Sequence, residues 1–243
     1  MSVVYILSCL IVIIGNIGAI GKVIGAIFQY AFTPNAVIGG AAGAAIKMCI
    51  TWGVKRGVFS NEAGLGSAPI AHAASSERDP VKQGLYGIFE VFMDTIVICT
   101  LTGLTILSAF YSGGISWEYG VKGGNAVISS AFGTIMGNKV GAIIIALAIS
   151  LFALSTILSW ALYGSRCCEY IFKSTKCIKP YYVIFMIITL VGCQMGSGLA
   201  WDIADTLNGL MAIPNLVALL ALSGVVVKLV KDHFKNQEKK LSK

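Results

Sequence analysis

The sequence predicts an all-α, polytopic membrane protein, and three observations lead to this fold class. Hydrophobic residues make up 56% of the 243 residues, and the mean hydropathy is +0.82. Only 12% of the residues are charged, whereas soluble domains carry about 25%. Apolar runs such as 3–14, 96–110 and 140–158 belong to segments that approach or exceed the roughly 20 residues of a membrane-crossing helix.

Six spans are predicted, at about 3–29, 36–75, 82–111, 140–164, 180–198 and 203–230. The run 1–14 lacks basic residues before its apolar core and a convincing cleavage site after it, so we interpret it as a retained span. The segment 36–75 is too long for one ordinary crossing. Four glycines and Pro69 interrupt it around the polar run Ser60–Glu62, and this pattern predicts a broken helix.

Basic residues fall unevenly on the two sides that these spans define. Twelve lie near 78–82, within 166–179 or from 228 onward, and only Lys122 and Lys139 lie in loops of the opposite side. Cytoplasmic loops of membrane proteins are enriched in Lys and Arg. Both termini are therefore predicted to be cytoplasmic, and 112–139 is predicted to be a large external loop.

The composition also argues against other function classes. The net charge of +7 comes from loops and a tail without interleaved aromatic residues, so nucleic acid is not an expected partner. The seven cysteines show no metal-type pairing and are interpreted as reduced thiols. No phosphate-binding loop, metal-ligand cluster or nucleophile with its base is found, and His72 and His233 are the only histidines. We therefore do not expect an enzyme.

The predicted helix break is the first candidate site. A helix that restarts at membrane depth exposes N–H groups, and these groups and the positive end of its dipole favour an anion such as a substrate carboxylate. Gly64 and Gly66 would let a ligand approach the backbone closely. The alternative is that small residues only allow tight helix packing. Because polar side chains and clustered glycines coincide at 61–66, we favour a binding site there.

Three ionisable residues within the spans keep two interpretations each. Glu62 is either a functional carboxylate or a structural partner of Lys55 or Arg56. His72 is either a proton relay or, as we favour, a packed histidine with satisfied hydrogen bonds. Asp94 lies well inside the span 82–111 and is either functional or the centre of a structural hydrogen-bond network.

The span 140–164 contains the second candidate site. Thr156 and Trp160 are one helical turn apart and share a face, and Ser155 precedes them. Hydroxyl oxygens suit a hard cation. Alternatively, these hydroxyls only bond back to a carbonyl of the preceding turn. We favour the ion site.

The last span and the tail are expected to be mainly structural. Asp202 and Asp205, near the external end of the span, are predicted to cap the helix or to meet water, and Pro214 is predicted to kink it. Residues 1–230 form the predicted transmembrane region. Residues 231–243 form a basic cytoplasmic tail, whose composition suits a position near anionic lipid headgroups.

Four runs resemble one transporter family in order along the chain. They are GVKRGVFSNEAGLGSAP at 53–69, EVFMDTIVICT at 90–100, FALSTILSW at 152–160 and WDIADTLNGLMAIPN at 201–215. On these runs the chain resembles the alanine or glycine:cation (sodium) symporter family. The resemblance implies symport of alanine or glycine coupled to sodium, which is a transported ion and not a prosthetic group. It also implies a multi-pass protein of the cytoplasmic membrane, in contact with lipid.

The resemblance further implies a leucine-transporter-like fold of two inverted repeats. On that alignment the six spans correspond to the fifth to tenth core helices, which is the second half of the family core. The implied amino acid ligands are Phe59, Asn61, Gly64, Gly66, Thr156 and Trp160, and the implied sodium ligands are Ser155 and Thr156.

The early core helices of the family are expected to be missing from this sequence. The chain would then need a separate N-terminal half as a partner, and we expect no transport by the chain alone. The alternative function is a transport-inactive membrane remnant or one half of a split transporter.

Overall fold

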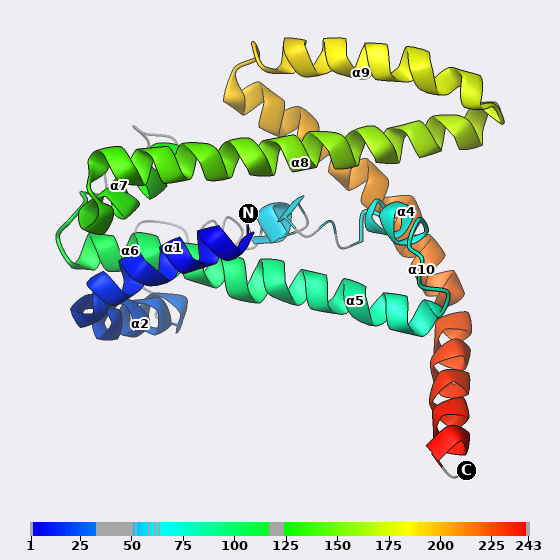
Figure 1. The fold of residues 1–243 in the computed structure, drawn as a ribbon, viewed down its shortest axis with the longest axis horizontal. Coiled ribbons are helices and arrows are strands. Elements are labelled where there is room, and N and C mark those ends of the chain that lie inside the picture. The colour runs from blue at the N-terminus through cyan, green and yellow to red at the C-terminus, as the bar shows by residue number, and fades with distance from the viewer. Residues whose placement is uncertain are drawn as a thin grey trace. The chain divides into compact units, whose positions relative to one another are not determined.

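The computed structural model (Figure 1) describes residues 2–32, 51, 53–57, 59, 60, 62, 64–116 and 124–241. Within these ranges the chain is helical apart from short turns, and they contain no strand. The all-α prediction is therefore confirmed. The helical elements are α1 Ser2–Gly15, α2 Ile17–Phe32, α4 Ala68–His72, α5 Pro80–Phe92, the π-helical turn η2 Met93–Ile98, α6 Cys99–Tyr111, α7 Gly124–Met136, α8 Asn138–Phe172, the short 3₁₀-helix η3 Thr175–Cys177, α9 Ile178–Gly192 and α10 Ser197–Leu241.

Four helical segments of these ranges are long and apolar enough to cross a membrane: Pro80–Tyr111, Asn138–Phe172, Thr175–Gly192 and Ser197–Lys239. They match the last four predicted spans. A fifth candidate arises if α1 and α2 together count as one span. The predicted span 36–75 lies partly outside the described residues.

The chain divides into two compact units, and each is described by itself. One unit comprises Met1–Gly53 and Met93–Ile157, and the other comprises Val54–Phe92 and Leu158–Lys243. The boundaries cut two long helices, because α5 continues through η2 into α6 and α8 contributes to both units.

In the first unit, the predicted first span is not one straight helix. Its two halves, α1 and α2, are bent by 98° at Asn16. The Asn16 side-chain amide donates to the Val12 carbonyl at 3.1 Å and to the Thr134 hydroxyl at 3.4 Å. An asparagine that bonds a nearby carbonyl in this way competes with regular helix geometry, which gives a physical reason for the bend at this residue.

The core of the first unit includes a helix that lies within the predicted loop 112–139. That segment contains α7, whose Phe132 is fully buried. Phe132 packs with Tyr5, Cys9 and Val12 of α1 and with Ile145 of α8. The glycines at both ends of α7 suggested a loop. The apolar residues between them form a helix because they are buried against α1.

In the second unit, α10 is the longest element, with 45 residues. It contains Pro214 and continues through 231–241, so most of the predicted basic tail is helical and extends the last span. An α-helix rises about 1.5 Å per residue, which makes α10 about twice as long as the roughly 30 Å thickness of the hydrocarbon core.

The far part of α10 contacts the start of α5 through one carboxylate. Asp79 precedes α5, and its Oδ1 accepts hydrogen bonds from the N–H groups of Val81 at 2.9 Å and Lys82 at 3.4 Å. Its Oδ2 lies 2.8 Å from Nδ1 of His233. Desolvation raises the pKa of Asp79, but these two N–H bonds and the contact with His233 together outweigh it, so the pKa lies below its usual value.

We expect Asp79 to make stability depend on pH in the acid range. A carboxyl whose pKa is lower in the folded protein stabilises it above the unfolded pKa of about 3.9, and this contribution is lost as the pH falls through the folded pKa. Thermal unfolding in detergent between pH 3 and 7 should therefore show a shallower acid decline for Asp79→Asn than for the unsubstituted chain. Asp232→Asn, next to His233, is the matched control. Parallel declines for Asp79→Asn and the unsubstituted chain would contradict this role.

Candidate functional site at the helix break

The helix break lies where the sequence predicts it. Residues 53–57, 59 and 60 are helical, and α4 begins at Ala68. Between them the backbone adopts positive φ at Glu62 (54°), Gly64 (84°) and Gly66 (83°). This left-handed region is open to glycine and strained for other residues. Asn61, the predicted polar residue of the break, lies outside the described residues.

The break loop, of which residues 62 and 64–67 are described, is held by specific hydrogen bonds. The Ser67 hydroxyl donates to the Glu62 carboxylate at 2.6 Å, and the Leu65 N–H donates to the Glu62 carbonyl at 3.1 Å. The Asn215 side-chain amide, on α10, donates to the Gly64 carbonyl at 3.0 Å. Leu65 and Ser67 are buried. The loop is therefore an ordered structure that α10 supports.

The helix after the break differs from the expectation. It contains only the five residues Ala68–His72, so few peptide dipoles add up at its start. Attraction of an anion by a helix dipole is correspondingly small here. Recognition at this site has to rely on the hydrogen-bonding groups of the loop itself.

Charged and aromatic side chains of the helix before the break contact the start of α10. Lys55 Nζ and Arg56 Nη2 lie 3.2 and 3.3 Å from the same Oδ2 of Asp205. The Arg56 guanidinium stands 4.0 Å above the Trp201 ring, and the Phe59 and Trp201 rings lie 4.8 Å apart. The Asp205 side chain is only 10% exposed, so this carboxylate depends on its two cationic partners.

These contacts change two interpretations from the sequence. Asp205 was expected to cap its helix or to meet water, and this is wrong: α10 begins at Ser197, and Asp205 forms ion pairs inside the protein. Among the described residues, Ser67 donates a hydrogen bond to the Glu62 carboxylate in the break. The basic pair 55–56 is bound to Asp205 instead of Glu62.

The predicted residues on α8 lie on a continuous helix. The Ser155 and Thr156 hydroxyls both donate to the Phe152 carbonyl at 2.9 Å. This back-bonding uses the proton of each hydroxyl and leaves its lone pairs available to a cation. Trp160 follows Thr156 by one turn, and its ring contacts Tyr163 edge-on at 5.7 Å. A shared pocket of these residues with the break stays a prediction.

His72 is bonded on both sides of its ring, as the favoured interpretation expects. Its Nδ1 lies 2.6 Å from the Gln83 side-chain nitrogen, and its Nε2 lies 3.5 Å from a Glu90 carboxylate oxygen. Both partners are on α5, one turn on either side of Gly87. Asp94, by contrast, lies in the π-turn η2. Such turns are frequent at functional sites. A functional role of Asp94 therefore stays a prediction, beside the structural one.

Three residues of this region were not singled out from the sequence. Asn215 and Trp201 lie in the last matching run but were read as helix, although a side-chain amide at membrane depth needs a partner. Tyr163 follows Trp160 by three residues and shares its face, and its ring contacts the Trp160 ring edge-on. Polar groups on the apolar helices were the signal that could have found them.

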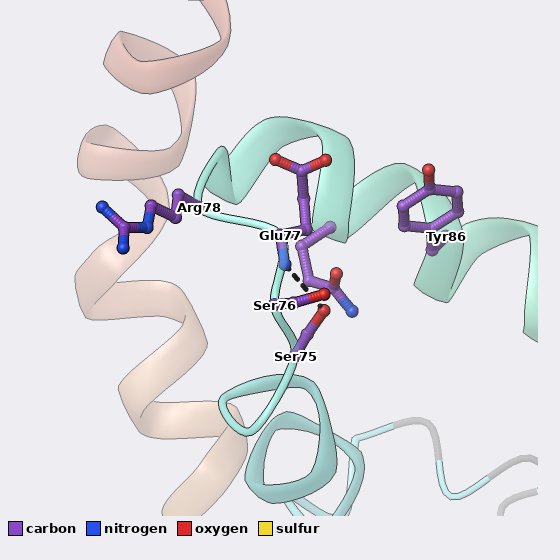
Figure 2. Close-up of a pocket in the computed structure, with 6 residues that line it drawn as sticks. Ser75, Ser76, Glu77, Arg78 and Tyr86 are labelled. Atoms are coloured by element: carbon purple, nitrogen blue, oxygen red, sulfur yellow. Dashed lines mark hydrogen bonds between the residues drawn. The ribbon is translucent and has the colours of Figure 1, made fainter.

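A pocket also lies at the turn between α4 and α5. It has a volume of about 610 Å³ and is lined by Ser75, Ser76, Glu77, Arg78, Gln83 and Tyr86. Figure 2 shows the Glu77 N–H bonded to the Ser75 hydroxyl and the Arg78 side chain extending away from the other labelled residues. This pocket lies apart from the break loop, and none of the predicted site residues lines it.

The comparison with known families identifies the family of the chain. The model of the sodium:alanine symporter family matches residues 1–243. The chain belongs to this family. Its members are transporters and not enzymes, and together with the apolar helices this identifies a multi-pass membrane protein.

Individual members of the sodium:alanine symporter family are similar to this chain over nearly its whole length. An uncharacterized transporter of Haemophilus influenzae is 40% identical over 96% of the chain and 50% of its own length. The sodium/alanine symporter AgcS of Methanococcus maripaludis is 45% identical over 95% and 49%. The probable sodium/glutamine symporter GlnT of Bacillus subtilis is 38% identical over 98% and 48%. The chain thus spans about half the length of these relatives.

We expect the Asp205 carboxylate to stabilise the contact between α10 and the helix before the break. Asp205→Asn leaves Lys55 and Arg56 without their anion, and loss of a charge-assisted hydrogen bond costs about 1.5–3 kcal/mol. The thermal unfolding midpoint in detergent should fall. Asp202→Asn, one turn earlier and exposed, is the matched control and should change the midpoint little. Equal effects of the two substitutions would argue against the ion pairs.

Proposed function

We propose that the chain takes part in sodium-coupled symport of alanine or glycine across the cytoplasmic membrane. The observation that carries this proposal is the ordered break loop, with two glycines at positive φ and a bonded network of polar groups, in a chain of the sodium:alanine symporter family. A broken helix offers unpaired backbone groups to a small zwitterion at membrane depth. Transport by alternating access then needs no ATP.

The proposed architecture is the second half of a leucine-transporter-like inverted-repeat core, with residues 1–230 in the membrane. An N-terminal half and membrane lipid are its proposed partners. The amino acid binds at the break through Phe59, Asn61, Gly64 and Gly66, and at α8 through Thr156 and Trp160. Ser155 and Thr156 contribute hydroxyl oxygens to the sodium ion.

The geometry of α8 supports the sodium assignment in one respect. Both hydroxyls donate their single proton to the Phe152 carbonyl. Only their oxygen lone pairs are then available to a ligand. Lone pairs suit a cation and not another acceptor. The same geometry also occurs in purely structural positions, such as Thr189 on α9, which donates to the Phe185 carbonyl at 2.8 Å.

The test is radiolabelled uptake in a bacterial strain that lacks alanine transport. The chain is expressed alone and beside the N-terminal half of the archaeal relative, with sodium or choline as the external cation. Alanine, glycine and glutamine are compared, because one relative carries glutamine in its name. We expect sodium-dependent uptake of alanine or glycine in at least one arrangement. Absence of uptake in both, with the chain present in the membrane, would overturn the proposal.

The ion site is tested in the same assay with Thr156→Val, which removes the hydroxyl and keeps the side-chain shape. The sodium concentration for half-maximal uptake should rise several-fold, because one cation ligand is lost. Thr189→Val removes an equally back-bonded hydroxyl on another helix and is the matched control. A sodium dependence that shifts equally in both variants would reduce Thr156 to a structural role.

The proposed orientation places the C-terminus in the cytoplasm, with 231–243 as its extension. It follows from the excess of Lys and Arg on one side of the predicted spans. A reporter fused after Lys243 should read as cytoplasmic, and one inserted at Gly123 as external. Reversed signals would refute the orientation.

A further inference from the structure

Asn215 of α10 is placed to shape the break loop. Its side-chain nitrogen donates to the Gly64 carbonyl at 3.0 Å. Its side-chain oxygen lies 2.8 Å from the position that a Cβ on Gly66 would occupy. One side-chain amide therefore contacts the loop at both glycines of positive φ.

The sequence around Asn215 explains why α10 can provide this contact. Pro214 has no N–H, so the carbonyl four residues before it loses its helical partner. The helix is weakened next to Asn215, while the Leu216 side chain comes to 3.8 Å from a Cβ position at Gly64. The chain thus combines an amide and an apolar contact at one level of α10.

We propose that Asn215 is a positioning residue, which holds the break loop in the conformation that binds the transported amino acid. The proposal rests on the proposed function, because it takes the break as the binding site. Asn215 need not contact the substrate itself. It fixes the Gly64 carbonyl and leaves room beside Gly66 only for a residue without a side chain.

The two glycines provide a test within the chain. Gly64 and Gly66 have nearly the same φ, 84° and 83°, so an alanine at either position meets the same backbone strain. Only at Gly66 would the new Cβ collide with Asn215, at 2.8 Å from Oδ1 and 3.0 Å from Cγ. The contact at Gly64 is an ordinary one, at 3.8 Å.

We therefore expect Gly66→Ala to be coupled to position 215 and Gly64→Ala to be additive. In a double-mutant cycle, Asn215→Ala should recover part of the stability lost in Gly66→Ala and none of that lost in Gly64→Ala. The thermal unfolding midpoint of the full chain in detergent is the measurement. Additivity in both cycles would overturn the contact.

Positioning is measured by two further readouts. Hydrogen exchange of peptides covering 62–70 should be faster in Asn215→Leu, which keeps the bulk and removes the donor. Asn208→Leu is the control, since Asn208 lies two turns earlier on α10 and forms no hydrogen bond to the described residues of the loop. In uptake, Asn215→Leu should raise KM for alanine about three- to tenfold, as expected for one lost hydrogen bond, and change the maximal rate less.

Asn215→Asp separates hydrogen bonding from packing. A protonated carboxyl can donate to the Gly64 carbonyl, whereas an ionised one repels it. Its uptake relative to the unsubstituted protein should therefore recover as the pH falls, which a purely steric role would not produce. Unchanged exchange of 62–70 and an unchanged KM would overturn the positioning role. If exchange is faster in Asn215→Leu but the unsubstituted protein takes up no alanine, the positioning role stands and only the proposed function is refuted.

Discussion

The requirement that buried polar groups find partners governs the part of this chain that carries the break. A helix that stops and restarts at membrane depth releases N–H and C=O groups, and each unsatisfied group costs several kcal/mol in hydrocarbon. Asn215 supplies one partner, at the Gly64 carbonyl. Within the loop, the Leu65 N–H donates to the Glu62 carbonyl. The break persists because some of these groups are bonded within the protein, and the others are left for a ligand.

The same requirement applies to the charges beside the break. The Asp205 carboxylate is largely buried and would be costly without cationic partners, and one of its oxygens pairs with both Lys55 and Arg56. The Trp201 ring covers the guanidinium and packs on Phe59. Two positions of α10 thus support the broken helix: Asp205 neutralises its charges, and Asn215 bonds its backbone.

The sequence is a good guide to this fold wherever long apolar runs decide the structure. The last four spans can be predicted because hydrophobic length alone determines a crossing helix. The helix break can be predicted because clustered glycines and polar residues have few other uses in such a span. By contrast, α7 is hidden by flanking glycines, and the bend at Asn16 depends on a contact with Thr134 that no local pattern contains.

The site is less predictable than the fold for the same reason. Types of residue indicate what a group needs, and only the folded chain indicates which neighbour supplies it. Glu62, Lys55 and Arg56 looked like mutual partners because they are close in sequence. Their partners are instead Ser67 and Asp205, the latter about 150 residues away along the chain. The assembly of the Thr156 and Trp160 set with the break still rests on the resemblance.

The continuity of α10 has a geometric consequence. Asn215 and His233 lie about 18 residues apart, which is about five full turns at 3.6 residues per turn. They therefore face the same side, where one meets the break loop and the other meets Asp79. An inserted or deleted residue between them would rotate one contact by about 100° relative to the other. The number of residues in this stretch of α10 therefore fixes the angle between the two contacts. Substitutions on its outer side leave that angle unchanged, whereas a change in length does not.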